Sequence, residues 1–240
     1  MFGLKIIKRN KNKMDPNDLT LYESPFNKIR IGKSYDGGYI ITEIPNINYG
    51  LLLSAGVGND ISFEQEFCNK FNTKCLTFDG TISNFNTNND SIKHITKNIR
   101  PNNNDLETNL FDIIEEYDDI FLKMDIEGYE LEWVQSLTSE QLNKFSQMVI
   151  EFHWAFHYED VFDKINKTHY LLHFHANNCC HPLVEHKGVN LPIVFECTFV
   201  NKRYIDGPLS LNKETLPTKL DMQNVEWRSD FSFDYKPLVN

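Results

Sequence analysis

Apolar residues along the chain change repeatedly between a spacing typical of strands and a spacing typical of helices. Short apolar runs predict strands at 51–53, 74–78, 92–99, 120–124, 147–152, 170–174 and 192–200. Periodic apolar positions predict helices at 62–71, from Asp105 to Tyr117, at 130–137, from Thr138 (capped with Gln141) toward Phe145, and at 159–167. Strands that alternate with helices predict an α/β fold, with a mostly parallel, doubly wound sheet and an antiparallel pair at its end.

Three parts of the chain differ in pattern. Residues 1–45 are expected to form an N-terminal extension with a β-hairpin, whose strands at 29–31 and 39–44 turn through 34–38. Residues 46–202 carry the alternating strands and helices of one domain. Residues 203–240 contain three prolines and are expected to form an irregular tail that packs on this domain.

Composition indicates a globular chain and limits its partners. The 240 residues are 40% hydrophobic and carry a formal net charge of −10. This acidity argues against nucleic acid or an anionic membrane as the main partner, and no apolar run approaches the roughly 18 residues of a membrane span. Five cysteines, with Cys179 and Cys180 adjacent, suit no ordinary disulfide framework. Because the first residues also lack a signal-peptide pattern, we expect a cytoplasmic protein.

Two turns at the ends of predicted strands could bind a ligand, because parallel sheets bind ligands beyond the carboxyl ends of their strands. Gly56 and Gly58 lie in the turn from Ser54 to Asp60, where the backbone could approach a ligand closely. An ordinary tight turn explains a lone Gly-x-Gly equally well, and Ile61 stands where the dinucleotide fingerprint has its third glycine.

The second turn begins with Asp79 and Gly80, at the end of the next predicted strand. An acidic residue about 20 positions after the glycine turn can accept hydrogen bonds from a ribose diol. An Asp before Gly is also common in surface turns. Together with the glycine turn, Asp79 favours a ligand of the adenosine type.

The central predicted strand ends in a third acidic turn, Lys123 to Glu130, which holds Asp125, Glu127 and Glu130. Carboxylates at the edge of a sheet are costly unless they are solvated, paired or used. The preference of acidic residues for a helix start explains Glu130 and Glu127 better than Asp125.

These turns carry a resemblance to a known family. The run FLKMDIEGYELEWV at 121–134 resembles the K-[ILM]-D-[IV]-E-G-x-E pattern of the FkbM-type methyltransferases. The glycine turn, Asp79 and the sequence Asp-Gly-Gly-Tyr at 36–39 are also similar to that family's layout, over about residues 31–153. The stretches 175–179 and 195–199 resemble a methyltransferase-like subgroup of eukaryotes and large viruses. One departure is Ser54, which stands where many members carry an acidic residue.

The resemblance implies a Rossmann-like, seven-stranded sheet of the class I methyltransferase type and S-adenosyl-L-methionine as the cofactor. On that layout the glycines approach the methionine moiety and the carboxylate after the second strand binds the ribose. The cofactor-binding residues are then Ser54, Gly56, Gly58, Asp60, Asp79 and Gly80. The implied acceptor is a sugar, a glycan or another hydroxylated small molecule, methylated on oxygen.

Methyl transfer from a sulfonium is an in-line displacement, assisted by a base that takes the hydroxyl proton. The candidate catalytic residues are Asp125 and His153, although a histidine at a strand end is more often only hydrogen-bonded. Glu127, His175 and Asn177 are the candidate substrate-binding residues.

A stretch rich in histidine and cysteine offers an alternative. Zinc-ligand types crowd residues 173–186, at His173, His175, Cys179, Cys180, His181 and His186. Without a paired C-x2-C spacing we assign no metal, and we interpret the stretch as a loop beside the acceptor site. Two rival functions stay open, a nicotinamide-dependent oxidoreductase and a non-catalytic, metal-stabilised interaction module. A need for a divalent ion at Asp125 and Glu127 also stays open.

Overall fold

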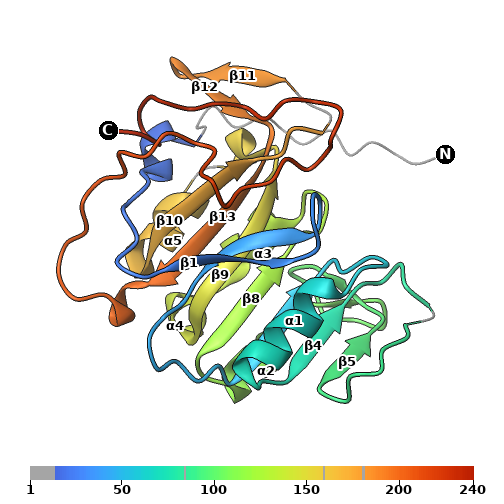
Figure 1. Ribbon diagram of the computed structural model, residues 1–240. Helices are drawn as coiled ribbons and strands as arrows, with labels where there is room; N and C mark the ends of the chain where they lie inside the picture. The colour runs from blue at the N-terminus through green and yellow to red at the C-terminus, as the bar shows by residue number, and fades with distance from the viewer. Residues whose placement is uncertain (1–13, 84, 159, 180–181) are drawn as a thin grey trace.

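The computed structural model describes residues 14–83, 85–158, 160–179 and 182–240. Its centre is a seven-stranded sheet in the order β10-β13-β9-β8-β3-β4-β5 (Figure 1). Five neighbouring strands pair with one another in parallel, and a sixth, β10, runs in the same direction. The five are β3 (Leu51–Ala55), β4 (Cys75–Phe78), β5 (Ile92–Ile95), β8 (Ile120–Met124) and β9 (Phe145–His153). Between β9 and β10 (His169–Ala176), β13 (Val194–Asn201) runs antiparallel to both. The predicted α/β fold with a mostly parallel sheet is confirmed.

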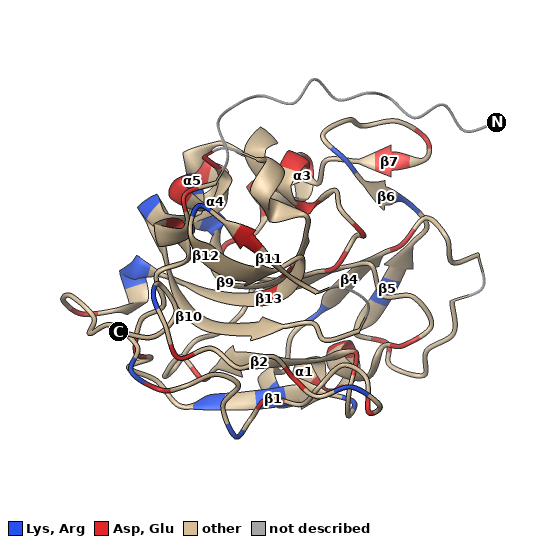
Figure 2. Ribbon diagram, turned by 90° about the horizontal axis from the view of Figure 1, so that it is seen from above, with Lys and Arg blue, Asp and Glu red and all other residues tan. Residues whose placement is uncertain are grey.

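Helices cover both faces of the sheet (Figure 2). One face carries α1 (Ser62–Phe71) and the antiparallel pair β1 (Lys28–Gly32) and β2 (Gly38–Thr42). The opposite face carries α3 (Glu130–Ser136), α4 (Ser139–Lys144) and α5 (Val161–Thr168), and α2 (Phe111–Glu116) packs against α4. The predicted capping box is confirmed, because the side chains of Thr138 and Gln141 each bond the other's backbone N–H.

Three predicted elements were wrong in extent. The stretch 92–99 breaks after β5, and its end forms β6 (Asn98–Ile99), which pairs with β7 (Glu107–Thr108) in a separate small sheet. The helix expected from Asp105 begins only at Phe111. The Asn104 carboxamide accepts the N–H groups of Leu106 and Glu107, which fixes a turn there and leaves Leu106 72% exposed.

The strand expected at 192–200 is also two elements. β12 (Val189–Pro192) pairs with β11 (Leu183–His186), and β13 starts only at Val194. An apolar run cannot reveal this break, because both segments are largely buried. The helix expected from Glu159 is α5, although Glu159 itself lies outside the described residues, as do Cys180 and His181.

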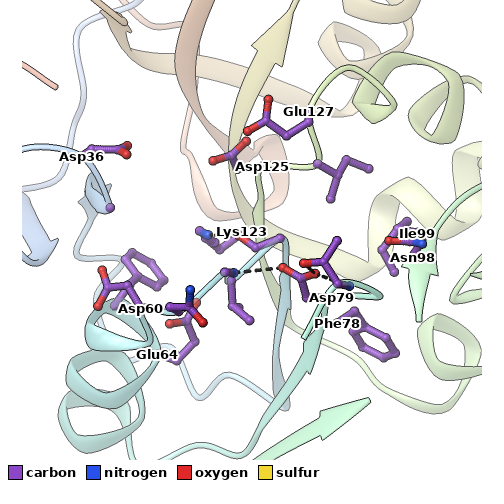
Figure 3. Close-up of a pocket in the computed structure, with 18 of the residues that line it drawn as sticks. Asp36, Asp60, Glu64, Phe78, Asp79, Asn98, Ile99, Lys123, Asp125 and Glu127 are labelled. Carbon is purple, nitrogen blue, oxygen red and sulfur yellow. Dashed lines mark hydrogen bonds between the residues drawn. The ribbon is translucent and has the colours of Figure 1, made fainter. Parts of the chain in front are cut away.

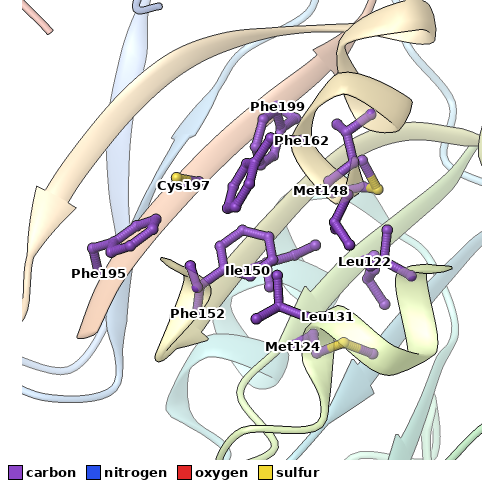
Figure 4. Close-up of a cluster of buried hydrophobic side chains, with 14 of the residues drawn as sticks. Leu122, Met124, Leu131, Met148, Ile150, Phe152, Phe162, Phe195, Cys197 and Phe199 are labelled. Atoms are coloured by element: carbon purple, nitrogen blue, oxygen red, sulfur yellow. The ribbon is translucent and has the colours of Figure 1, made fainter. Parts of the chain in front are cut away.

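The core on the α3–α5 side of the sheet is packed with aromatic rings (Figure 4). The ring centroid of Phe152 on β9 lies 4.8 Å from the ring centroid of Phe162 on α5 and 5.9 Å from that of Phe195 on β13. Each fully buried ring contributes about 1.5–3 kcal/mol to folding. This packing fixes the strand ends and so provides a rigid base for the groups beyond them.

After Tyr204 the described chain forms only isolated bridges, Tyr22 with Leu211 and Leu216 with Phe233. Its turns cross the edge of the sheet at β10 (Figure 1). Across the described ranges, no helix combines the length and the apolar character that crossing a membrane requires.

Candidate active site

A cavity of about 610 Å³ opens beyond the carboxyl ends of β3, β4 and β8 (Figure 3). The strand order reverses between β3 and β8, because the chain continues from β3 to β4 on one side and returns to β8 on the other. Ligands of open α/β sheets bind in the crevice at this switch point. The glycine turn, Asp79 and the acidic turn, which the sequence singled out separately, line this one cavity.

The two glycines of the first turn, Gly56 and Gly58, meet different structural requirements. Both have positive φ, 74° at Gly56 and 51° at Gly58. A Cβ atom on Gly56 would lie 1.6 Å from the carbonyl oxygen of Asp125, whereas a Cβ on Gly58 would meet nothing within 4 Å. Gly56 therefore allows two turns to pack together, and Gly58 borders open space in the cavity.

Asp79 is held firmly at the end of β4. One carboxylate oxygen accepts the N–H of Gly58 at 2.9 Å, and the other accepts the N–H and hydroxyl of Thr81 at 2.8 and 2.6 Å. Burial raises the pKa of Asp79, but these hydrogen bonds outweigh it and hold the pKa below its ordinary value. Asp79 is thus an ionised acceptor with lone pairs left for a ligand. Gly80 packs on the Asn98 side chain, outside the cavity lining.

The start of α1 supplies a further carboxylate, which the sequence analysis missed. Ser54 is fully buried beneath the cavity, and its hydroxyl donates to Glu64. Glu64 lines the cavity and is 1% exposed, and its second oxygen has no hydrogen-bond partner among the described residues. Burial raises the pKa of Glu64. Nearby, Asp60 caps the N–H of Ser62 and pairs with Lys33 of the loop after β1 at 3.2 Å.

The acidic turn after β8 is built around Glu130. This residue is fully buried, and its carboxylate accepts the N–H groups of Ile126 at 2.9 Å and Gly128 at 3.0 Å. Gly128 has φ of 100°, and Glu127 sits at φ of 56° with its side chain 86% exposed. Glu130 therefore holds the turn, which places both Asp125 and the more exposed Glu127 in the lining of the cavity (Figure 3).

Asp125 has an oxygen that nothing in the described chain satisfies. Its Oδ1 is screened from solvent and has no hydrogen-bond partner. Burial raises the pKa of Asp125 to about 6, against the opposing effect of Lys123 and His153. Lys123 donates to the carbonyl of Gly56 at 3.0 Å and lies over the Tyr39 ring, 5.3 Å from its centroid.

His153 lies at the tip of β9, beside the same turn. Its Nδ1 is 3.3 Å from Glu130, and its Nε2 is 3.6 Å from Glu127. Burial lowers the pKa of His153, but the neighbouring carboxylates, Glu130 foremost, outweigh it and raise the pKa above the ordinary value. The structure thus brings the two candidate bases, Asp125 and His153, together within one cluster.

A family comparison agrees with this geometry. The model of the Methyltransferase FkbM domain matches residues 15–178, more than half of the chain. The chain belongs to the FkbM methyltransferase family. The matched region includes β3, β4, β8 and β9, and with them the residues of the cavity. A search of curated proteins found no match.

The histidines near the end of the FkbM domain separate in the structure. His173 is 2.7 Å from Asp221, His175 is 2.9 Å from Asp230, and His186 bonds the carbonyl of Met14. His175 belongs to β10 and not to a loop, and it is 4% exposed. Its contact with the acceptor stays a prediction.

Asn177 follows β10 and donates to Glu151 at 3.1 Å, so it lies near His153 and its contact with the acceptor also stays a prediction. Among the described residues, this histidine-rich stretch does not gather into a group with metal-ligand geometry.

Other residues of the FkbM domain line the cavity although the sequence analysis gave them no role. They come from the loop after β1, from β6 and from the acidic turn, and include Lys33, Asn98, Arg100 and Tyr129. Arg100 stacks on Tyr129, 3.2 Å from the ring centroid. Only Glu64 left a signal in the sequence, as an acidic residue between Phe63 and Phe67 of an otherwise apolar helix face.

Proposed function

We propose that this protein is an S-adenosyl-L-methionine-dependent methyltransferase that methylates a hydroxyl group of a sugar, glycan or other small molecule. Membership of the FkbM family supports methyl transfer. The sheet, with antiparallel β13 inserted between β9 and β10, supports the Rossmann-like, class I type. The free thiols of Cys68, Cys75 and Cys197 support a reducing compartment, for which we propose the cytoplasm.

The charge of the cavity is the observation that carries this proposal. Carboxylates outnumber cations in its lining, where Lys33, Arg100 and Lys123 face Asp36, Asp60, Glu64, Asp79, Asp125 and Glu127. S-adenosylmethionine carries a sulfonium and an ammonium group against one carboxylate, so an acidic cavity attracts it. The pyrophosphate of a nicotinamide cofactor is doubly negative and would be repelled. The cavity therefore favours a methyltransferase over the rival oxidoreductase.

Glu64 can replace the acidic residue that many family members carry at the position of Ser54. A carboxylate missing from the end of β3 is supplied instead from α1, where Glu64 is bonded to Ser54. We assign the oxygen of Glu64 that has no partner to the ammonium group of the cofactor. Asp79 then takes the ribose hydroxyls with its remaining lone pairs, and the backbone at Gly58 lies against the methionine moiety.

The chemistry needs an acceptor hydroxyl aligned with the methyl group and relieved of its proton. Asp125 projects into the cavity with an oxygen free to accept that proton, and a pKa of about 6 suits a base near neutral pH. His153 is the second candidate base. Holding donor and acceptor in line is expected to contribute most of the acceleration.

Calorimetry tests the proposal, with S-adenosylhomocysteine, NAD and NADP titrated separately into the protein. We expect binding of S-adenosylhomocysteine alone. Asp79→Ala removes the acceptor of the ribose hydroxyls and should weaken that binding by about 1.5–3 kcal/mol. Lack of measurable affinity for S-adenosylhomocysteine at millimolar concentration, or preference for NAD, would end the assignment.

A further inference from the structure

His153 stands among four carboxylates that come from three parts of the chain. Asp125 and Glu127 follow β8, Glu130 begins α3, and Glu151 precedes His153 by two residues on β9. Asp125, Glu130 and His153 each bring one ligand-type atom within 4.8 Å of the other two. The Nε2 of His153 also lies 3.7 Å from Glu151. Carboxylates gathered around one imidazole are costly to bury unless protons or a cation compensate their charge.

The imidazole is already oriented as metal-binding histidines are. Nδ1 faces the fully buried Glu130, whose own position is set by the N–H groups of Ile126 and Gly128. Metal-binding histidines commonly donate their other ring N–H to a carboxylate in this way, which fixes the tautomer. With the proton on Nδ1, the lone pair of Nε2 points at the remaining carboxylates.

The spacing around Nε2 is too long for hydrogen bonds and suits a shared ion. Its distances are 3.6 Å to Glu127 and 3.7 Å to Glu151, beyond the range of a good hydrogen bond. Two neighbouring ligands that each lie about 2.1 Å from one ion are about 3.0 Å apart in octahedral and about 3.4 Å apart in tetrahedral coordination. The observed separations are a few tenths of an ångström longer, so small side-chain movements would close them around an ion.

Two carboxylate oxygens of the cluster lack hydrogen-bond partners among the described residues. This observation supports a bound ligand independently of the number of charges. Oδ1 of Asp125 and Oε2 of Glu151 are screened from solvent and make no hydrogen bond in the described chain. The Glu151 side chain is only 5% exposed. Its other oxygen, Oε1, lies 3.7 Å from Nε2 of His153 and accepts the side-chain N–H of Asn177 at 3.1 Å. An unsatisfied buried oxygen costs about 1–3 kcal/mol, a cost that a bound ligand removes.

We propose that this cluster binds one divalent cation. The ligands are Nε2 of His153 and the carboxylates of Asp125, Glu127 and Glu151, and Glu130 is a positioning residue. A mixed set of imidazole and carboxylate favours a first-row ion such as Mn²⁺ over Ca²⁺. Cation binding is independent of methyl transfer. Its use in catalysis rests on the proposed function: the cation would lower the pKa of an acceptor hydroxyl, and Asp125 and His153 would then act as its ligands and not as the base.

Mn²⁺ binding to the whole chain tests the site without any methyl donor. Electron paramagnetic resonance counts free Mn²⁺, and we expect one ion per chain with a Kd below about 100 µM. Glu151→Gln and His153→Ala each remove a ligand and should raise the Kd at least about tenfold. Glu132→Gln makes the same charge change on an exposed residue of α3 and should leave the Kd unchanged. Circular dichroism checks that each variant is folded.

The result separates the cation site from the proposed function. Absence of saturable binding below about 1 mM Mn²⁺, or an equal loss in the Glu132→Gln control, overturns the site. A chain that binds S-adenosylhomocysteine but not Mn²⁺ overturns the cation alone. A chain that binds Mn²⁺ but not S-adenosylhomocysteine keeps the cation site and overturns the donor assignment.

Discussion

At the scale of single residues, the cavity is shaped by close approaches as much as by charge. Gly56 and Gly58 look equivalent in the sequence, and a Gly-x-Gly pattern suggests that both serve the ligand. In the structure Gly56 has a packing role, because the carbonyl of Asp125 occupies the space that a side chain at position 56 would need. Gly58 alone borders the space that a ligand could fill.

The two glycines therefore predict opposite outcomes for the same substitution. Gly56→Ala forces the turn after β3 away from Asp125 and should lower the free energy of unfolding by at least about 3 kcal/mol. Gly58→Ala meets no neighbour and should cost only about 1–2 kcal/mol for its positive φ. Urea denaturation measures both. Equal losses in the two variants would contradict the packing role of Gly56.

Glu64 predicts a loss of cofactor affinity that its position in the sequence does not suggest. Glu64→Gln keeps the shape and the bond to Ser54 but removes the charge assigned to the ammonium group. S-adenosylhomocysteine should then bind roughly 10- to 100-fold more weakly by calorimetry, the loss for a hydrogen bond to a charged group. Glu66→Gln makes the same change on α1 outside the cavity lining and serves as the control. Unchanged affinity in Glu64→Gln would refute the assignment.

At the scale of elements, the sequence predicted what local chemistry decides. Apolar runs located β3 and β8, and the capping box located the start of α4. The acidic turn was predicted as a site because its carboxylates are unusual at the tip of a strand. Each of these signals lies within a few consecutive residues.

The failures lie where hydrogen bonds and strand pairing, and not apolar periodicity, decide the structure. The periodicity of 106–117 fits a helix, yet Asn104 bonds the backbone of the following residues and β7 pairs with β6, so α2 starts late. The acidic residue on the apolar face of α1 marks Glu64 as unusual, but its bond to Ser54, ten positions away, is visible only in the structure. The arrangement around His153 likewise needs β9 beside β8, so the sequence could predict its members but not their grouping.

At the scale of the whole molecule, buried ion pairs hold the tail on the sheet. His175 of β10 lies between Glu196 of β13 and Asp230 of the tail, and His173 pairs with Asp221 of the tail. Burial lowers the pKa of His175, but its bonds to Asp230 and Glu196 outweigh this and raise the pKa well above the ordinary value. Burial raises the pKa of Asp221, but His173 outweighs it and lowers the pKa.

These pKa directions predict how stability depends on pH. The contribution of His175 is complete below its unfolded pKa near 6.5 and is lost as the pH rises through its folded value. The contribution of Asp221 is present above about pH 4 and is lost as the pH falls below that. The combined contribution of these two residues should therefore be greatest between roughly pH 4 and pH 7, and thermal melts from acid to alkaline pH measure it.

A single variant measures the contribution of His175 to this pH-dependent stability. His175→Gln leaves Glu196 and Asp230 without their cation and should lower the Tm at pH 6 by on the order of 10 °C, from a loss of about 3–5 kcal/mol. Its Tm should also stay level through the alkaline range, where that of the wild type falls. Parallel curves for the two proteins would show that His175 does not hold the tail by charge.

The loop between β1 and β2, which supplies Lys33 and Asp36 to the cavity, is fastened by residues made much later in synthesis. Tyr35 in this loop donates its hydroxyl to Glu226, and its N–H to the sulfur of Met222 at 3.0 Å. These partners are 191 and 187 positions away along the chain. A nascent chain on the ribosome can thus fold its parallel strands before this wall of the cavity is anchored. The chain can complete this cavity only when translation has passed Glu226.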